Sequence, residues 1–537
     1  MKFKNLKSET KKKYPSEALG ERRRIHFIGI CGVAMSALAL AMKKAGHTVT
    51  GSDKGIYPPI STYLKESDVD YYTGWHPELM SKDGNPDLVV VGNVAGSTNP
   101  EWIYTQENNL EYVSYPELIE RFFIKENSIV CAGTYGKSTS TAILTWLFRE
   151  LNYDPSYMFG GISLNNMSAA ELTDSLVENP STKLRTSYSI LEGDEYKSSR
   201  WDNGPKFAHY SPTHLLLTSV VWDHADVYPT EQSYIDAFAN LLKNMPENGL
   251  VVLSAKVIHD EPQLAKLPKS KIVTYGKTED NDYQYKNVNT TKDGLSFDIC
   301  HNSNIYNITT NTIGDYMADN MTGCFALAHS MGIEPEKIIK HLASFKNIKR
   351  RLEKKYDAGV TVFDDIAHSP KKAEAVLRSL CQIYFKPRHG EKSVEVSADE
   401  IQKLDISQNT NSPKDSSSPS RELGLARNKL IAIFEPNSGN RQPESIPGYD
   451  NAFVDADEVI IPKLTHIKRD PSKPAPIDGE KLAEVISKTH DNVQYIDDDE
   501  KLLDYLVNNT KTGDVVVFLG SHGFRGMIDE LVSTLSS

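Results

Sequence analysis

The sequence predicts an α/β protein in which parallel strands alternate with helices, and three features lead to this prediction. A short apolar run near residue 25 passes through a glycine turn into a helical pattern. A second glycine turn near residue 133 does the same, and apolar runs alternate with helical patterns again after residue 430. The chain has 537 residues, which exceeds what one hydrophobic core usually supports. We therefore expect three domains.

The composition argues against several classes of protein. The formal net charge is −12 and the isoelectric point is near 5.7, whereas proteins that bind nucleic acid present basic surfaces to it. No apolar run has the length of a membrane span. The 5 cysteines show no Cys-x-x-Cys spacing, which is typical of reduced thiols in a cytoplasmic protein. We expect small-molecule substrates, with no nucleic-acid or membrane partner, and the sequence leaves the oligomeric state open.

The first domain begins with the order strand, glycine turn, helix, strand. Residues 1–24 are rich in charge and lack the apolar core of a secretory signal, so we expect a basic mobile tail before it. An apolar run at 25–28 leads into a turn with Gly29 and Gly32, and a second strand at 48–53 ends in polar groups. This is the plan of a nucleotide-binding half-sheet. Taken alone, the pattern suits equally well a turn that only packs a helix on a sheet.

The second glycine turn predicts a nucleotide triphosphate site. It lies between an apolar run at 129–132 and a helical pattern at 141–151, so its glycines and exposed amides can surround an anion. Lys137 can reach the outer phosphates, and Ser138 or Thr139 can bind magnesium. Cys131 occupies the position of the first glycine in the generic phosphate-binding loop, and the alternative is an ordinary glycine turn. The residues expected to bind ATP here are Gly133, Thr134, Tyr135, Gly136, Lys137, Ser138 and Thr139.

Polar residues follow two further apolar runs. The run at 188–191 ends in Glu192, Asp194 and Glu195, and carboxylates at the end of a strand near a phosphate loop suit Mg²⁺. A solvated acidic loop is the competing interpretation for Glu192. The run at 215–221 is followed by His224, which on general grounds is as well explained as a residue that only caps the strand.

The run Ala-Gly-Thr-Tyr-Gly-Lys-Ser-Thr at 132–139 resembles the loop of the Mur ligases, ATP-dependent enzymes that build the peptide stem of peptidoglycan. The glycine turn followed by Gly-Ser-Asp at 51–53 resembles the N-terminal domain of members that act on UDP-muramyl substrates. The resemblance implies the three-domain Mur ligase architecture, with a Rossmann-like N-terminal domain, a central P-loop ATPase domain and a Rossmann-like C-terminal domain. We expect a UDP-muramyl-binding domain at 25–125, an ATP-binding ligase domain at 126–346 and an acceptor-binding domain at 347–537, with hinges near 125 and 346.

Two segments depart from an alternation of parallel strands and helices. Between 281 and 310, short strand-like runs separated by Asn, Asp and Gly predict an antiparallel extension of the central sheet. From about 386 to 428 the composition shifts to Ser, Pro, Asn, Lys and Glu, and the apolar content is too low to build a core. We expect a disordered insertion there.

The resemblance also implies roles for individual residues. It makes Lys137, Glu192 and His224 catalytic and gives Mg²⁺ the ligands Ser138, Glu192 and His224. Asn320, Arg351 and Asp365 are implied in binding the adenine end, the phosphates and the ribose of ATP. The residues implied for the UDP substrate are Gly29, Gly32, Ser52, Asp53 and Asn93. Those implied for the acceptor are His368, Asn437, Ser438, Arg441 and His522. Tyr316 and Met317 replace the family's His and Asn, which leaves open whether ATP binding is weaker.

The motifs Phe-Glu-Pro-Asn-Ser at 434–438 and Gly-Phe-Arg-Gly at 523–526 resemble the branch of the family that recycles peptidoglycan. That resemblance implies ATP- and Mg²⁺-dependent joining of UDP-N-acetylmuramate to the peptide L-Ala-γ-D-Glu-meso-diaminopimelate through an acyl phosphate. Ligation to L-alanine and a non-catalytic UDP-muramyl-binding protein remain alternatives. A folate or cyanophycin-type ligase would share the later domains but lack the UDP-type domain at 25–125.

Overall fold

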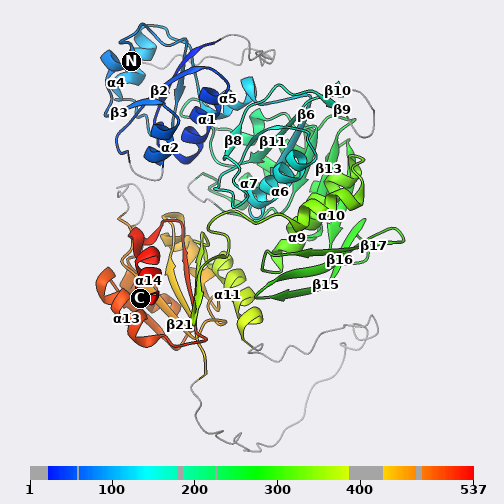
Figure 1. The fold of residues 1–537 in the computed structure, drawn as a ribbon, viewed down its shortest axis with the longest axis vertical. Helices are drawn as coiled ribbons and strands as arrows, with labels where there is room; N and C mark the ends of the chain where they lie inside the picture. The colour runs from blue at the N-terminus through cyan, green and yellow to red at the C-terminus, as the bar shows by residue number, and fades with distance from the viewer. Residues whose placement is uncertain are drawn as a thin grey trace, which may run out of the picture. The chain divides into compact units, whose positions relative to one another are not determined.

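The computed structural model describes residues 22–56, 60–178, 185–223, 227–385, 427–466 and 475–536. The chain forms two compact units, Met1–Arg351 and Leu352–Ser537, which Figure 1 shows from blue to red along the chain. The tail expected at 1–24, except its last three residues, lies outside the described part, as do His224 and nearly all of the expected insertion. The units divide after Arg351, where the sequence suggested 346.

The first unit begins with a parallel sheet whose described strands run in the order β3-β2-β1-β4-β5. The strands are β1 (Arg24–Ile28), β2 (Thr48–Asp53), β3 (Asp70–Thr73), β4 (Leu88–Val91) and β5 (Tyr112–Val113). The helices are α1 (Val33–Lys44), α2 (Ile60–Glu66), α3 (Pro77–Met80), α4 (Pro100–Glu107) and α5 (Tyr115–Phe122). The strand order reverses between β1 and β4, and ligands of such sheets bind at the carboxyl ends of the strands beside this reversal. The first strand begins one residue earlier than the expected boundary at residue 25.

A larger sheet follows, with described strands in the order β17-β16-β15-β14-β13-β12-β6-β11-β7-β8. Its first strands are β6 (Asn127–Ala132), β7 (Ser156–Met158), β8 (Ala170–Glu171), β11 (Tyr188–Gly193) and β12 (His214–Leu217). It continues with β13 (Leu250–Ser254), β14 (Lys271–Gly276), β15 (Tyr283–Thr291), β16 (Gly294–His301) and β17 (Asn304–Thr310). The last three pair antiparallel, which confirms the predicted antiparallel extension. Two short strands, β9 (Val177–Glu178) and β10 (Arg185–Thr186), pair separately.

Helices cover both faces of this sheet. They are α6 (Lys137–Glu150), α7 (Glu231–Lys243), α8 (Ala255–Asp260), α9 (Tyr316–Ser330) and α10 (Pro335–Ala343), with short turns η1 (Lys206–His209) and η2 (Leu264–Lys266). Side chains alternate along β6, so Ile129 and Cys131 pack with α6 and α9, whereas Val130 and Ala132 pack in the cluster that includes α7. Burial on both faces explains why the parallel strands are almost continuous apolar runs.

The second unit is built on a sheet whose described strands run in the order β18-β19-β23-β20-β21-β22, with only β18 antiparallel. They are β18 (Glu353–Ala358), β19 (Val360–Asp365), β20 (Leu430–Glu435), β21 (Glu458–Pro462), β22 (Val493–Ile496) and β23 (Val515–Gly520). The helices are α11 (Pro370–Tyr384), α12 (Gly479–Ile486), α13 (Asp499–Asn509) and α14 (Met527–Leu535), with turns η4 (Gly439–Arg441), η5 (Pro443–Tyr449) and η6 (Phe524–Gly526). The predicted α/β alternation after residue 430 is therefore confirmed.

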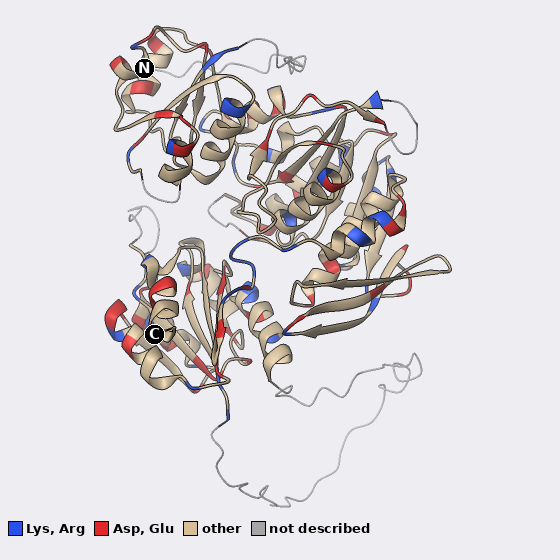
Figure 2. Cartoon of the chain, viewed as in Figure 1, with Lys and Arg blue, Asp and Glu red and all other residues tan. Residues whose placement is uncertain are grey.

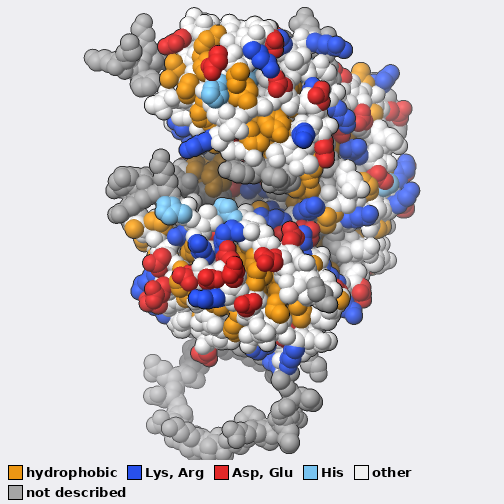
Figure 3. Space-filling view, turned by 60° about the vertical axis from the view of Figure 1, so that its left-hand side comes forward, with side chains coloured by type: hydrophobic (Ala, Val, Ile, Leu, Met, Phe, Trp, Pro, Cys, Tyr) orange, Lys and Arg blue, Asp and Glu red, His pale blue; other side chains and the backbone are white. Residues whose placement is uncertain are grey.

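The surface carries charges of both signs. Figure 2 shows Lys and Arg interspersed with Asp and Glu over each unit. On the face drawn in Figure 3, hydrophobic side chains are scattered among charged and uncharged polar ones. Within the described ranges, no helix is long and apolar enough to cross a membrane. All five cysteines are free thiols.

Candidate active site

The phosphate loop leaves β6 and enters α6 through two glycines with left-handed backbone. Gly133 has φ 136° and Gly136, the residue before α6, has φ 81°. A Cβ on Gly133 would lie 2.9 Å from the backbone of Ser219, and a Cβ on Gly136 would lie 2.5 Å from Oδ1 of Asn320. The conformation and the space both require glycine, as the sequence pattern suggested.

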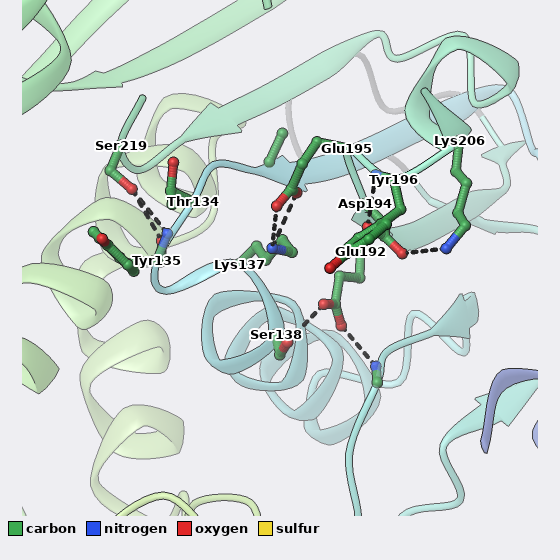
Figure 4. Close-up of polar contacts among 12 residues, drawn as sticks. Thr134, Tyr135, Lys137, Ser138, Glu192, Asp194, Glu195, Tyr196, Lys206 and Ser219 are labelled. Carbon is green, nitrogen blue, oxygen red and sulfur yellow. Dashed lines mark hydrogen bonds and ion pairs between the residues drawn. The ribbon is translucent and has the colours of Figure 1, made fainter. Parts of the chain in front are cut away.

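Hydrogen bonds attach the loop to the segment that follows β12. The Thr134 amide donates to the Ser219 carbonyl over 3.1 Å, and the Tyr135 amide donates to Ser219 Oγ over 2.9 Å. The Thr134 hydroxyl donates to the Val221 carbonyl over 2.8 Å. Figure 4 shows Tyr135 beside Ser219 and Thr134 on the same turn. The loop is therefore preformed, which lowers the entropic cost of binding a phosphate.

Lys137 begins α6 and points at an acid that follows β11, the strand next to β6. Its Nζ lies 3.0 Å from Oε2 and 3.1 Å from Oε1 of Glu195, as Figure 4 shows. The Glu195 side chain is fully buried and that of Lys137 is 17% exposed. Burial alone lowers the pKa of Lys137, but the carboxylates of Glu195, Asp194 and Glu192 outweigh it and raise this pKa above its ordinary value. These carboxylates therefore hold the charged side chain of Lys137 in place at the start of α6.

Ser138 and Glu192, which are both expected to bind Mg²⁺, are in direct contact. The Ser138 hydroxyl donates to Oε1 of Glu192 over 2.6 Å, and Oε2 accepts from the Gly160 amide over 2.6 Å. A hydroxyl and a carboxylate side by side fit Mg²⁺, which prefers oxygen ligands and usually takes only one or two carboxylates, with waters and phosphate oxygens completing its shell. Among the described residues, no group of three or more His, Cys, Asp or Glu forms a metal site by itself. His224, the third expected ligand, lies outside them.

Asp194 and Glu195 were expected only as part of an acidic run at the end of an apolar strand. In the structure Asp194 Oδ2 accepts from Lys206 Nζ over 2.6 Å, and the Lys206 ammonium also lies 5.0 Å from the Tyr115 ring centroid. Burial raises the pKa of Asp194, but Lys206 and Lys137 outweigh it and leave this pKa below its usual value. The acids at the end of β11 are therefore divided between two lysines. Their position after an apolar strand was the signal that could have identified them.

Asn320 lies on α9 against the phosphate loop and is 5% exposed. Met317, which replaces an expected polar residue, is fully buried in the core between α9 and the sheet. The next polar position, Asp319, accepts from Lys256 Nζ over 2.9 Å and from the Tyr285 hydroxyl over 3.2 Å. Met317 therefore contributes packing at this end of the site.

In the N-terminal sheet, the glycine turn after β1 meets the ends of β2 and β4. The Gly29 amide donates to the Ser52 carbonyl over 2.8 Å, and the Cys31 amide donates to Oδ2 of Asp53 over 2.9 Å. A Cβ on Gly29 would lie 2.5 Å from Cγ2 of Val94, which follows exposed Asn93. The structure thus brings the expected UDP-substrate residues together around one turn, and Gly32 is exposed at the start of α1.

The Ser52 side chain points away from that turn. Its hydroxyl donates to Oε2 of the fully buried Glu101, whose Oε1 accepts from the Tyr72 hydroxyl over 2.6 Å and from the His76 amide over 2.8 Å. His26 Nε2 lies 3.6 Å from Oε2 of Glu101. Only the Ser52 backbone therefore faces the turn, while its side chain belongs to an interior polar network.

The second unit holds all five expected acceptor residues, in the segments that follow β19, β20 and β23. It also holds Asp365, which is expected to bind ATP. Both carboxylate oxygens of Asp365 accept backbone amides, from Leu352 over 2.7 Å and from Ala367 over 2.8 Å. His368 Nδ1 lies 2.7 Å from the Ile366 carbonyl. Arg351, the remaining expected ATP residue, ends the first unit and is half-buried.

The loop after β20 is organised by its own polar residues. Oδ1 of Asn437 accepts from the amide and the side chain of Asn440, over 2.9 and 2.8 Å. Ser438 is exposed, and so is His522 after β23. Buried Arg441 donates to the carbonyls of Ile477 and Thr465, over 3.0 and 2.9 Å. Its guanidinium therefore secures the backbone of this loop.

Comparisons with known proteins give the family. Residues 24–126 match the model of the Mur ligase family catalytic domain, and residues 131–328 match the Mur ligase middle domain. A Haemophilus influenzae protein named UDP-N-acetylmuramate–L-alanyl-γ-D-glutamyl-meso-2,6-diaminoheptandioate ligase is 33% identical over 361 residues, which cover 67% of this chain and 76% of that protein. The Escherichia coli protein of the same name is 28% identical over 518 residues, 96% of this chain and 98% of that protein.

A solved structure agrees with these relatives. The murein peptide ligase of Psychrobacter arcticus superposes with a TM-score of 0.63 at 26% identity, covering 96% of this chain and 99% of that one. One conclusion follows from these matches, together with the phosphate loop, its Lys-Ser pair and the order of the strands beside it. The chain belongs to the Mur ligase family and is an ATP-dependent ligase that forms amide bonds.

Proposed function

We propose that this ligase joins UDP-N-acetylmuramate to the murein peptide L-Ala-γ-D-Glu-meso-diaminopimelate, a reaction of peptidoglycan recycling. Two observations together support the proposal. The phosphate loop is preformed, with Lys137 and Ser138 at the start of α6, and relatives named for that activity match nearly the whole chain. We assign residues 25–125 to the UDP substrate, 126–346 to ATP and 347–537 to the acceptor.

The chemistry requires an activated carboxyl group. A carboxylate oxygen of the muramyl lactate group attacks the γ-phosphorus of ATP, ADP leaves, and an acyl phosphate forms. The peptide amine then attacks the acyl carbon, phosphate leaves, and the amine nitrogen loses a proton to give the amide. The backbone amides at the start of α6, with Lys137, hold the γ-phosphoryl group and stabilise the charge that develops on it.

Magnesium, held by Ser138 and Glu192 and, as we propose from the resemblance, by His224, would supply further charge stabilisation at the phosphates. The pairing of Ser138 with Glu192 is compatible with this role, because both oxygens already converge at the first turn of α6. When ATP binds, the Lys137 ammonium must reorient so that it contacts the phosphate as well as Glu195. The buried acids keep that lysine charged before it does so.

The UDP substrate is assigned to the end of β1 for a second reason besides the resemblance. Val33 and Val94 are 62% and 64% exposed, and both flank the glycine turn. Exposed apolar side chains on both sides of a glycine turn suit contact with the ring of a bound ligand. We place the reaction in the cytoplasm, where the free thiols of the chain would stay reduced.

Phosphate release from ATP tests the proposal, with Mg²⁺, UDP-N-acetylmuramate and either the tripeptide or L-alanine as acceptor. We expect release with the tripeptide. Release with L-alanine alone would instead assign the chain to the biosynthetic step, and no release with either would favour a non-catalytic binding protein. Lys137→Ala should abolish release, whereas Lys269→Ala, which alters a lysine that is 77% exposed, should leave it unchanged.

A further inference from the structure

A hairpin at residues 194–207 joins the phosphate site to the N-terminal sheet. It leaves the end of β11 and returns at η1, and the Phe207 amide donates to the Asp194 carbonyl over 3.2 Å at its base. Farther out, the Ser198 amide donates to the Gly204 carbonyl over 2.9 Å. The two arms therefore hold each other, and the bridging hairpin, as we call residues 194–207, can transmit a displacement from one end to the other.

The base of the bridging hairpin carries the acids that hold the catalytic lysine. Glu195 pairs with Lys137, and Asp194 pairs with Lys206. Figure 4 shows these two pairs beside each other on the segment that ends β11. A shift of the hairpin base therefore moves the electrostatic partners of Lys137.

The tip of the bridging hairpin docks on the N-terminal sheet. The Trp201 ring stacks on Trp102 at a centroid distance of 5.4 Å and an angle of 20°, and meets the Tyr112 ring edge-on at 5.3 Å. Beside it, Arg200 donates to the Asn93 carbonyl over 3.4 Å. The tip thus reaches the segment that the proposed function assigns to the UDP substrate.

His209, just after the hairpin, adds ion pairs to this contact. Its Nδ1 lies 2.7 Å from Glu120 on α5, and its Nε2 lies 2.8 Å from Asp202 at the hairpin tip. Both ring nitrogens face carboxylates, so both must donate, and that requires an imidazolium. The protonated ring therefore ties helix α5 of the N-terminal sheet to the hairpin.

We infer that the bridging hairpin is a positioning element that couples the UDP-substrate site to Lys137. The inference rests on the proposed function. A diphosphate bound beside Asn93 would interact with the guanidinium of Arg200 only while the tip is docked, so it stabilises the docked hairpin. The docked base in turn fixes the acids around Lys137. Coupling of this kind is reciprocal, so each ligand changes the affinity for the other by the same factor.

Calorimetric titration of the full chain tests the inference. A non-hydrolysable ATP analogue with Mg²⁺ is titrated with and without saturating UDP-N-acetylmuramate. We expect UDP-N-acetylmuramate to increase the affinity of the unaltered chain for the ATP analogue by about fivefold or more. Trp201→Ala should weaken UDP-N-acetylmuramate binding by itself and reduce this factor to less than about twofold, and Trp201→Phe should retain both.

Two histidine variants provide a matched comparison. His209→Gln removes the charge between Glu120 and Asp202 and should also lose the coupling. His259→Gln alters a histidine whose side chain is 88% exposed and should keep it. Equal coupling factors in the unaltered chain and in Trp201→Ala would overturn the inference, as would an unaltered chain without coupling. Failure of UDP-N-acetylmuramate to bind at all would instead contradict the proposed function itself.

Discussion

Replacing Lys137 by alanine should affect stability and catalysis by separate mechanisms. The Nζ atom lies 3.0 Å from Glu195, so at an effective dielectric constant of about 20 the gross attraction is about 5 kcal/mol. Removal of the lysine leaves the carboxylate buried and without its main cationic partner, which typically costs about 3–5 kcal/mol of folding free energy. The rate should also fall by at least about 10²–10³-fold, the usual effect of deleting one transition-state donor.

The double variant Lys137→Ala/Glu195→Gln separates the two effects. Glutamine has the shape of glutamate without its charge, so this variant should recover most of the lost stability. It should recover none of the ligation rate, because the group that holds the γ-phosphate is still missing. Calorimetric unfolding and phosphate release measure the two quantities. A single variant as stable as the unaltered chain, or a double variant that ligates normally, would refute this reasoning.

Three further outcomes are expected. Gly136→Ala forces a side chain onto a backbone with φ 81°, which costs about 1–2 kcal/mol before any clash, and should weaken ATP binding. Gly96→Ala, whose Cβ would meet no atom closer than 3.9 Å, should not, and nucleotide titration compares the two variants. The pKa of His209 is raised to about 9, because the carboxylates of Glu120 and Asp202 outweigh its burial. The stabilisation from this pair is therefore complete below pH about 6.5 and is lost as the pH rises through about 9. The free energies of unfolding of the unaltered chain and of His209→Gln should therefore converge at high pH. Ser52→Ala should destabilise by about 1–3 kcal/mol because a buried carboxylate loses a donor, while UDP-N-acetylmuramate affinity, measured by titration, stays unchanged.

The sheets and the phosphate loop could be predicted because their signals are local. Apolar runs buried on both faces, followed by glycines that need a left-handed backbone, leave a trace within about ten residues. The phosphate loop and its Lys-Ser pair lie where that trace predicted. The expected antiparallel extension was likewise visible from short strands separated by turn residues.

The partners of side chains could not be predicted in the same way. Lys137 and Glu195 are 58 positions apart in the chain, and only the parallel pairing of β6 with β11 brings them together. The family resemblance implies that Arg441 binds the acceptor, and no local pattern predicted that its guanidinium also donates to two backbone carbonyls. No periodicity distinguishes a charged side chain that faces a ligand from one that satisfies the interior.

The interior position of the Ser52 hydroxyl bears on how variation in this family is interpreted. Natural selection would keep Ser52 even if substrate recognition never depended on its side chain, because Glu101 requires a donor inside the domain. Changes at position 52 should then be tolerated only together with changes at position 101. Joint variation at these two positions would then reflect a requirement of folding. A change at one position alone should lower the amount of folded protein in cells before it alters substrate specificity.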